Sequence, residues 1–388
     1  MGYIILIARK VLYSKTKGQG VLMTNITTKK KESQPYKELA LLEDVIEECD
    51  VKKNKNVEFT DLIYRKVEEK KLSENMWNFI RNCNHFMRYY TDKHFEKRKL
   101  MQANSCKNRF CPICAWRKAH KDAMKHMIIL KKLALDKKYA FLFVTLTAPS
   151  VSGERLREEL DDYAKAFKRF SETKAFEKIN VGYIRKLEIT YNENRNDYHP
   201  HYHLLICVNK SYFTSRDYIK HEKWLTMWQI AKRDNNITNV DVRKVNSDNA
   251  FLEISKYTAK DSEYMKNDDK KGDILSVLYD SMKGKQAITY NKIFKELNLK
   301  YKSGALDYLK ELDETKYVFK VIYKWFKNHY EEIESVELTE TELSEIDTVN
   351  DEILFLKNIT EFFDADVEVK NKMKNILIDE IDIENPEE

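Results

Sequence analysis

Three histidines occupy alternate positions in HPHYHLLICV, residues 199–208, and imidazoles at this spacing could bind a metal ion. On a β-strand, side chains two residues apart share a face and lie about 6.6 to 6.8 Å apart, so two adjacent imidazoles can reach one ion. His199 and His203 would be about 13 Å apart, which is too far for both. Pro200 favours a strand start or an edge, because it cannot donate to a ladder. We therefore predict that His201 and His203 bind the ion, and the role of His199 stays open.

A third ligand is expected from the strand that precedes the histidines. Residues 181–192 and 199–208 both have strand character, and the Asn-rich turn between them indicates a β-hairpin. If this turn is symmetrical about Arg195, Glu188 lies opposite positions 201–203. Two imidazoles and one carboxylate suit Mn²⁺ or Mg²⁺, and the imidazoles alone would also suit Zn²⁺. The alternative is that the histidines only hydrogen-bond to water on an exposed strand face.

Four cysteines predict a second metal site, which would hold a structural zinc ion. Cys106, Cys111 and Cys114 lie close together in CKNRFCPIC, and Cys83 lies upstream. Two thiolates two residues apart wrap one Zn²⁺ ion, and a structural site needs four ligands. Cys83 is the preferred fourth ligand, and His85 competes with it. A redox C-x-x-C motif is the alternative interpretation.

Basic residues around the cysteines favour a zinc site beside DNA over a redox motif. They are Arg109, Arg117, Lys118 and Lys121. A redox motif would also leave the two further cysteines of the cluster unexplained. The remaining Cys49 and Cys207 are predicted to be packing residues.

Glu253, Tyr257 and Lys260 share one face of a helix that we expect at 247–265, because they are four and three positions apart. A tyrosine hydroxyl, with a pKa near about 10, is a poor nucleophile unless a metal or a cation stabilises its phenolate. Lys260 and the metal ion could supply that stabilisation, and Glu253 could act as a general base on water. Taken alone, the pattern is also that of an ordinary charged helix face.

The segments that carry these residues belong to a regular series of strands and helices. Strands are expected at 139–148, 181–192, 199–208 and 238–245, and helices at 154–176, 215–233 and 247–265. This order, with its central hairpin, predicts an α+β fold in which helices back an antiparallel sheet.

Five regions follow from composition and motif positions. They are a flexible N-terminal segment at 1–35, a helical, zinc-bearing DNA-binding region at 36–135, a catalytic domain at 136–270, a basic and aromatic helical region at 271–330 and an acidic tail at 331–388. Met23 is an alternative start to Met1.

The charge of the chain is unevenly divided. The formal net charge is +6, but residues 331–388 hold 20 Asp and Glu against 4 Lys, which leaves +22 on residues 1–330. A strongly basic body is typical of nucleic-acid binding, although Lys-rich composition is also common in AT-rich genomes. No apolar run reaches the roughly 18 residues of a membrane span and no signal peptide is recognisable, so we expect a cytoplasmic protein with no membrane partner.

In combination, the motifs resemble those of the HUH endonucleases. The resemblance is strongest to the replication initiators, or Rep proteins, of rolling-circle plasmids from low-GC Gram-positive bacteria. FLFVTLTAPS is similar to their first motif, HPHYHLLICV to their second and EISKYTAKD to their third, in the same order over residues 139–265. The Glu one turn before the Tyr, and the cysteines upstream, resemble the single-tyrosine branch of that family.

The resemblance implies a ferredoxin- or RRM-like sheet and a nick-and-join reaction at the plasmid's double-strand origin. Tyr257 would attack a phosphodiester, leaving a 5′-phosphotyrosine and a free 3′-OH that primes synthesis. His201 and His203 would hold the divalent ion, and Glu253 would activate water for the terminating cleavage. Origin DNA, single-stranded at the nick, would be the substrate. A host helicase and the replication machinery would be partners, and a homodimer is left open.

Two other functions are compatible with the sequence. An HUH transposase or relaxase shares the histidine pair and the tyrosine. A zinc-dependent, sequence-specific DNA-binding regulator would keep the histidines as structural residues. The E-x3-Y-x2-K pattern, the upstream cysteines and the motif order favour the plasmid initiator.

Overall fold

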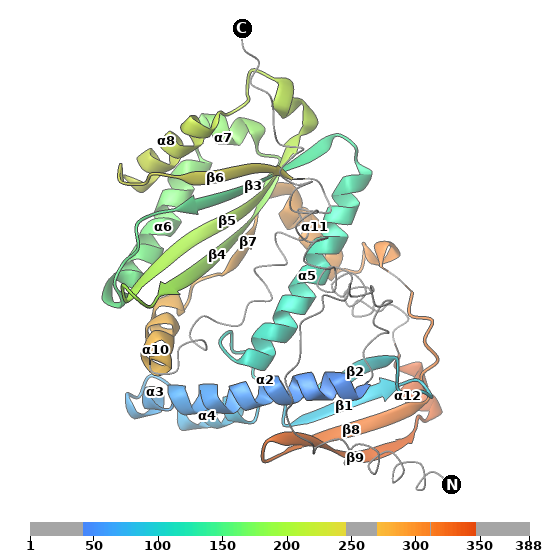
Figure 1. Ribbon diagram of the computed structural model, residues 1–388. Helices are drawn as coiled ribbons and strands as arrows, with labels where there is room; N and C mark the ends of the chain where they lie inside the picture. The colour runs from blue at the N-terminus through green and yellow to red at the C-terminus, as the bar shows by residue number, and fades with distance from the viewer. Residues whose placement is uncertain (1–41, 246–269, 311, 347–388) are drawn as a thin grey trace, which may run out of the picture. The chain divides into compact units, whose positions relative to one another are not determined.

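The computed structural model describes residues 42–245, 270–310 and 312–346. Within these residues the chain forms a four-stranded and a five-stranded antiparallel sheet with helices beside them (Figure 1). The α+β class that the sequence predicts is therefore confirmed. No helix in these ranges is long and apolar enough to cross a membrane.

Some predictions concern residues outside the described ranges. The helix expected to carry Glu253, Tyr257 and Lys260 is one of them. The flexible N-terminal segment and residues 347–388 of the acidic tail are others. The roles assigned to the three helix residues stay predictions.

The five-stranded sheet carries the histidines and has the strand order β6-β3-β5-β4-β7. Its strands are β3 (Tyr139–Thr147), β4 (Gly182–Asn192), β5 (Asp197–Asn209), β6 (Val240–Val245) and β7 (Ile288–Tyr290). The first four agree with the strands predicted from the sequence. The region of β7 is predicted to be helical, which is wrong at these residues because pairing with β4 satisfies their backbone groups.

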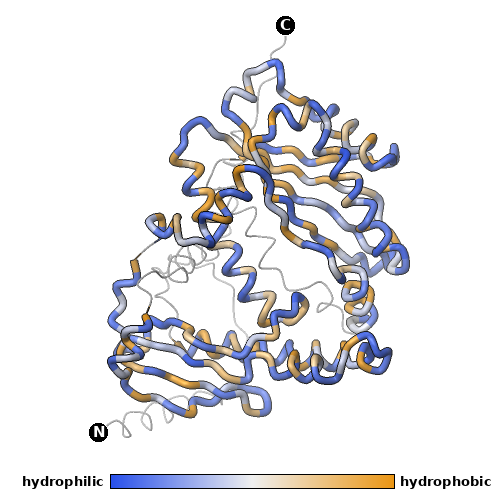
Figure 2. Tube along the Cα trace, turned by 180° about the vertical axis from the view of Figure 1, so that it is seen from behind, coloured by the Kyte–Doolittle hydropathy of each residue, from blue (hydrophilic) through white to orange (hydrophobic). Residues whose placement is uncertain are grey.

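Helices cover both faces of this sheet (Figure 1). The first face is covered by α6 (Leu156–Ser171), α7 (Lys174–Ile179) and α8 (His221–Lys232), and the second by α5 (Pro112–Leu135) and α11 (Lys292–Lys302). Alternation along β5 sends Leu204 and Ile206 into the first core and Leu205 and Cys207 into the second. Figure 2 shows the hydrophobic residues gathered along these strands. Because helices pack against both faces, the strands carry hydrophobic side chains on both sides of the sheet.

Two predicted helices differ in extent from the observed ones. The helix predicted at 154–176 is interrupted, because Thr173 begins α7 by accepting a hydrogen bond from the backbone N–H of Phe176. The helix predicted at 215–233 begins only at His221. Short 3₁₀ turns lie at Gly153–Arg155, Lys210–Thr214 and Asp307–Leu309.

The four-stranded sheet has the order β2-β1-β8-β9. Its strands are β1 (Phe86–Thr91), β2 (Arg98–Ala103), β8 (Phe319–Phe326) and β9 (His329–Glu337). The helical structure expected up to residue 330 is wrong for β8, and the start of the predicted acidic tail forms most of β9. Met87 of β1 pairs with Tyr323 of β8, so the sheet joins segments that are far apart in the sequence. A local sequence pattern cannot predict pairing between such distant segments.

Helices before and after this sheet complete the described part of the chain. They are α2 (Leu42–Ile63), α3 (Arg65–Glu68), α4 (Glu74–Arg81) and α12 (Glu340–Ser344). Leu42 and Ile46 of α2 pack on the four-stranded sheet, whereas Phe59 and Ile63 enter the core that also contains buried cysteines. One long helix therefore contributes to two cores.

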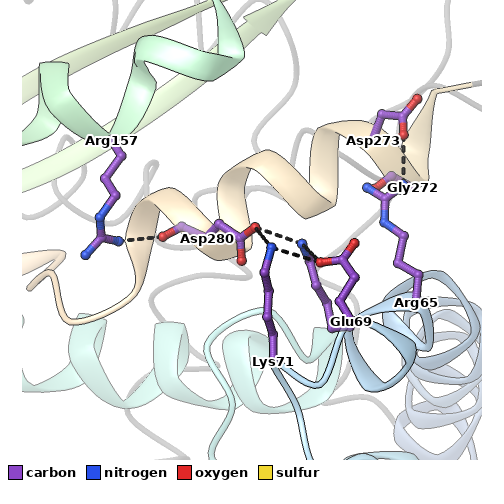
Figure 3. Close-up of polar contacts among 8 residues, drawn as sticks. Arg65, Glu69, Lys71, Arg157, Gly272, Asp273 and Asp280 are labelled. Atoms are coloured by element: carbon purple, nitrogen blue, oxygen red, sulfur yellow. Dashed lines mark hydrogen bonds and ion pairs between the residues drawn. The ribbon is translucent and has the colours of Figure 1, made fainter.

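Helix α10 (Lys271–Met282) directly follows the undescribed segment that contains Tyr257. Lys66 Nζ lies 2.8 Å from Asp280 Oδ2, and Arg157 of α6 donates to the Asp280 carbonyl at 2.6 Å (Figure 3). Near its start, Arg65 Nη1 pairs with Asp273 at 2.8 Å. Contacts from α3, its flanking residues and α6 therefore hold α10 at both ends.

Candidate functional site

Glu188, His201 and His203 converge on one face of the β4–β5 hairpin. The Nε2 atoms of His201 and His203 lie 3.0 and 2.7 Å from Glu188 Oε2. Glu188 pairs with His201 in the strand register, and His203 is two residues further along the same face. The ligand atoms of all three residues lie within 4.8 Å of one another. The hairpin therefore brings together the three predicted ligands.

These separations fit a divalent metal ion. Neighbouring ligands of octahedral Mg²⁺, at about 2.0 to 2.1 Å from the ion, lie about 2.9 Å from one another. The two nitrogen-to-oxygen distances of 3.0 and 2.7 Å are close to this value. The side chains of Glu188, His201 and His203 are only 14%, 11% and 6% exposed, which limits competition from water for the donor atoms. The group could therefore hold a metal ion.

The other nitrogen of each imidazole is also hydrogen-bonded. Thr145 Oγ1, on the neighbouring strand β3, lies 3.2 Å from His203 Nδ1, and the His199 carbonyl oxygen lies 3.2 Å from His201 Nδ1. When Nδ1 carries the proton, it donates to these oxygens and Nε2 keeps its lone pair for a metal. The His199 carbonyl can only accept and so favours this tautomer for His201, and the Thr145 hydroxyl can accept from the same tautomer of His203.

Thr145 was not singled out by the sequence. It pairs with His203 in the β3–β5 register, and its side chain faces the same side of the sheet. The sequence predicts both strands, but the neighbour of His203 depends on which strands pair and in which register. The signal in the sequence that could have identified Thr145 is its position in FLFVTLTAPS, the first of the three motifs.

Charge and burial favour the metal-binding forms of these groups. Burial raises the pKa of the Glu188 carboxyl, but hydrogen bonds and charges from His201 and His203 outweigh burial and hold that pKa below its ordinary value. Burial lowers the pKa of His203, although Glu188 opposes the shift. At neutral pH the carboxylate is therefore ionised and the His203 imidazole is neutral, as metal binding requires.

His199 points to the same face but does not join the group. Its ring centroid is 5.4 Å from that of His201, and its backbone carbonyl, not its imidazole, faces His201 Nδ1. Among the described residues around this hairpin, the group that could hold a metal ion consists of Glu188, His201 and His203. The side chain of His199 has no role assigned by this geometry.

The four predicted cysteines form a second cluster. Cys83 follows α4, Cys106 follows β2, and Cys111 and Cys114 lie at the start of α5. Their Sγ atoms lie within 4.8 Å of one another, with 3.4 Å between Cys83 and Cys114 and 3.6 Å between Cys106 and Cys114. Tetrahedral zinc with Zn–S bonds of about 2.3 Å separates its sulfurs by about 3.8 Å. The thiols therefore fit a four-coordinate zinc site, and His85, which the structure also describes, is not a member of it.

Hydrogen-bond donors surround the cysteine sulfurs. Asn56 Nδ2 of α2 lies 3.3 Å from Cys111 Sγ, and the Cys106 backbone N–H donates to Cys83 Sγ at 3.4 Å. Donors of this kind stabilise thiolates, which are the metal-binding form of cysteine.

The predicted DNA-binding residues near the cysteines fall into two groups. Lys118 and Lys121 are exposed on α5, and Lys118 pairs with an aspartate one turn away at 2.6 Å. Arg109 donates to a backbone carbonyl at 2.7 Å, and Arg117 Nη2 lies 3.5 Å from a methionine sulfur. Lys118, Lys121 and Arg109 are therefore exposed to solvent, whereas Arg117 is partly buried. Cys49 and Cys207 are buried in two other cores, as expected of packing residues.

Comparisons with known proteins point to replication. Residues 97–333 match the family model Rep_1, described as "Replication protein". A "Protein rep" of Staphylococcus aureus is 43% identical over 211 residues, which are 54% of this chain and 92% of that protein. A "Protein rep" of a Bacillus species is 32% identical over 245 residues, covering 58% of this chain and 80% of that protein. No solved structure matches the chain significantly.

Proposed function

Because the chain belongs to the Rep_1 family of replication proteins, we propose that it is a plasmid replication initiator that nicks one strand of a double-strand origin. The observation that supports the nicking chemistry most directly is the convergence of Glu188, His201 and His203 in a chain whose relatives are named rep proteins. The five-stranded sheet is proposed to be an HUH-type catalytic sheet. The catalytic region predicted at 136–270 then also needs β7 and α11, which complete the sheet and its cover.

Tyr257 is the proposed nucleophile, by its place in the motif EISKYTAKD. Its phenolic oxygen attacks the phosphorus, the bond from phosphorus to the 3′ oxygen breaks, and the 5′ phosphate stays on the tyrosine. The phenol gives up its proton, and the departing oxygen takes one to become the 3′-OH primer. Lys260, one turn further on, stabilises the phenolate by its positive charge.

Glu188, His201 and His203 are proposed to hold Mn²⁺ or Mg²⁺. A bound ion polarises a non-bridging oxygen of the scissile phosphate, which favours attack by an incoming nucleophile. The mixed nitrogen and oxygen donor set suits Mn²⁺ in particular, since Mg²⁺ prefers oxygen ligands. The three side chains, by holding the ion on the hairpin face, would orient the scissile phosphate there.

Termination is proposed to use Glu253. As a general base it accepts a proton from a water molecule that attacks the second phosphodiester, so that a second tyrosyl link is not needed. The resemblance supplies this role, because Glu253 stands one helical turn before Tyr257 in the sequence.

The four cysteines are proposed to hold a structural Zn²⁺ ion. The site would fasten the end of α4, the end of β2 and the start of α5, and so position the basic surface of α5. Lys118 and Lys121 on that surface, with Arg109 and Arg117 nearby, are the proposed contacts to DNA phosphates. Origin DNA is the proposed substrate, a host helicase and the replication machinery are proposed partners, and the cytoplasm is the proposed location.

A nicking assay with Tyr257→Phe tests the proposed enzyme. Wild-type protein with Mn²⁺ and supercoiled origin plasmid should produce nicked circles with protein linked to the 5′ end. Tyr257→Phe should produce neither, because the variant lacks the attacking oxygen. Tyr264→Phe, in the same segment, is the matched control and should nick normally. Nicking by Tyr257→Phe at the wild-type rate would show that another residue is the nucleophile, and a wild-type reaction without linked protein would refute the covalent mechanism.

A further inference from the structure

Lys53 of α2 is buried beside the cysteine cluster. Lys53 is only 1% exposed. Its Nζ donates hydrogen bonds to the Arg81 carbonyl at 2.6 Å, to the Cys83 carbonyl at 2.7 Å and to Asn56 Oδ1 at 3.1 Å. An ammonium group has three protons, and these acceptors satisfy all three. None of the three acceptors is a carboxylate, so they solvate the ammonium without neutralising its charge. Lysine is rarely buried in this way unless a negative charge is close.

The cysteine cluster is a source of such negative charge. Four thiolates around one Zn²⁺ ion carry a net charge of about −2, from the charges of the ligands and the metal. Cys83 and Cys111 are only 1% and 0% exposed, so water does little to stabilise that charge. Lys53, bonded to the Cys83 carbonyl, places a cation next to the cluster inside the core.

Asn56 connects Lys53 to a cysteine sulfur. Its Oδ1 accepts from Lys53, and its Nδ2 donates to Cys111 Sγ at 3.3 Å and lies 3.3 Å from the Ile80 carbonyl. Lys53 and Asn56 are three residues apart on α2 and therefore share one helix face. Asn56 is 0% exposed, so its amide has these protein partners in place of water.

We propose that Lys53 and Asn56 are positioning residues of the cysteine centre. The Lys53 ammonium offsets the negative charge of the zinc–thiolate group, and the Asn56 amide hydrogen-bonds the Cys111 thiolate and orients it. This inference rests on the proposed zinc site. Its consequence is that α2, which also packs on the four-stranded sheet, helps to retain the metal.

Zinc retention in a Lys53→Met variant tests this inference. Full-length, zinc-loaded protein is challenged with a chromogenic chelator, and the competition constant is measured together with zinc content. Lys53→Met should bind zinc about 10- to 100-fold more weakly, the usual effect of losing a residue that supports metal ligands. The matched control is Lys66→Met, because Lys66 is also buried, at 2% exposure, but pairs with Glu69 and Asp280.

The outcomes separate the inference from the zinc site itself. If wild type is loaded with zinc, and Lys53→Met and Lys66→Met both retain zinc as tightly as wild type, the inference is overturned and the proposed zinc site is unaffected. A wild-type protein that takes up no zinc would refute both the zinc site and the inference that rests on it. Loss of zinc in Lys53→Met alone would support the inference.

A second variant covers the case in which Lys53→Met does not fold. Asn56→Ser loses the amide donor to Cys111 and the acceptor for Lys53, whereas Asn54→Ser changes an exposed asparagine of the same helix. In protein loaded with Co²⁺, the thiolate-to-metal charge-transfer band should shift in Asn56→Ser and stay unchanged in Asn54→Ser. A band and a zinc competition constant that both match wild type in folded Asn56→Ser would also overturn the inference.

Discussion

At the scale of residues, the hairpin site depends on how its imidazoles are held as much as on their identity. His201 and His203 turn the same nitrogen, Nε2, toward Glu188, and each has an oxygen beside Nδ1. For His201 that oxygen belongs to the backbone, which no substitution removes. For His203 it is the hydroxyl of Thr145, which a substitution can remove selectively.

Thr145→Val should weaken metal binding while preserving the fold. Valine has nearly the shape of threonine but lacks the oxygen beside His203 Nδ1, so the imidazole loses a hydrogen bond that orients it. We expect Mn²⁺ affinity, measured by isothermal titration calorimetry, to fall by about 10- to 100-fold. Thr147→Val is the control, since the Thr147 hydroxyl bonds to the Asn239 carbonyl instead. Unchanged affinity in Thr145→Val would mean that Thr145 does not orient His203.

At the scale of elements, helix α5 is common to both candidate centres. Its start carries Cys111 and Cys114, and its middle packs against the sheet face that carries the histidines. His126 of α5 and His203 of β5 line the same small cavity of about 10 Å³. A change in the packing of α5 can therefore affect both centres, because interiors transmit strain through close contacts.

Buried His126 predicts a specific pH dependence of stability. It is 0% exposed, its Nε2 lies 2.7 Å from the Tyr290 hydroxyl, and burial lowers its pKa from 6.5 to about 3. Between these values the unfolded chain binds a proton that the folded chain does not, so stability falls as the pH drops from about 6.5 toward 3. This contribution is at most about 1.4 kcal/mol per pH unit.

His126→Gln should reduce that slope, because glutamine does not titrate and its amide can still hydrogen-bond to Tyr290. The measurement is the free energy of unfolding in urea at several pH values from 4.5 to 7.5. His94→Gln, which changes an exposed histidine, should keep the wild-type slope. If His126→Gln and wild type lose stability in parallel on acidification, proton uptake at His126 is not the cause.

At the scale of the whole molecule, the main feature is the separation of charge along the chain. Residues 347–388 contain 13 Asp and Glu and 4 Lys, so their removal would change the formal net charge from +6 to +15. Lysine and arginine bind DNA phosphates by displacing counterions, and an acidic segment on the same chain opposes this attraction.

Deletion of residues 347–388 should tighten binding to DNA of unrelated sequence. The increase should be largest near 50 mM KCl and should diminish by 300 mM, because salt screens the repulsion between tail and DNA. Fluorescence anisotropy with a labelled duplex measures both affinities across that range. A tail of equal length with Asp and Glu replaced by Asn and Gln should behave like the deletion. Equal affinities of deletion and full-length protein at low salt would show that the tail does not oppose DNA binding.

Spacing in the sequence was sufficient to predict which side chains converge at each candidate centre. The period of two in HPHYH places His201 and His203 on one strand face, and the turn symmetry places Glu188 opposite them, as the register shows. The C-P-I-C spacing similarly predicts a cluster at the start of α5, where the cysteines meet Cys83. The grouping of these side chains follows the predictions because side-chain direction in a strand or a tight turn depends on neighbours in the sequence.

Only the tertiary structure decided which residues support those ligands and how the second sheet is formed. Thr145 reaches His203 through strand pairing, and Lys53 and Asn56 reach the cysteines through the packing of α2. The pairing of β1 with β8 likewise joins distant segments, and it overrides the helical pattern expected there. Contacts between distant parts of a chain have no local period, so the sequence determines the chemistry available to each centre, and packing determines which groups tune it.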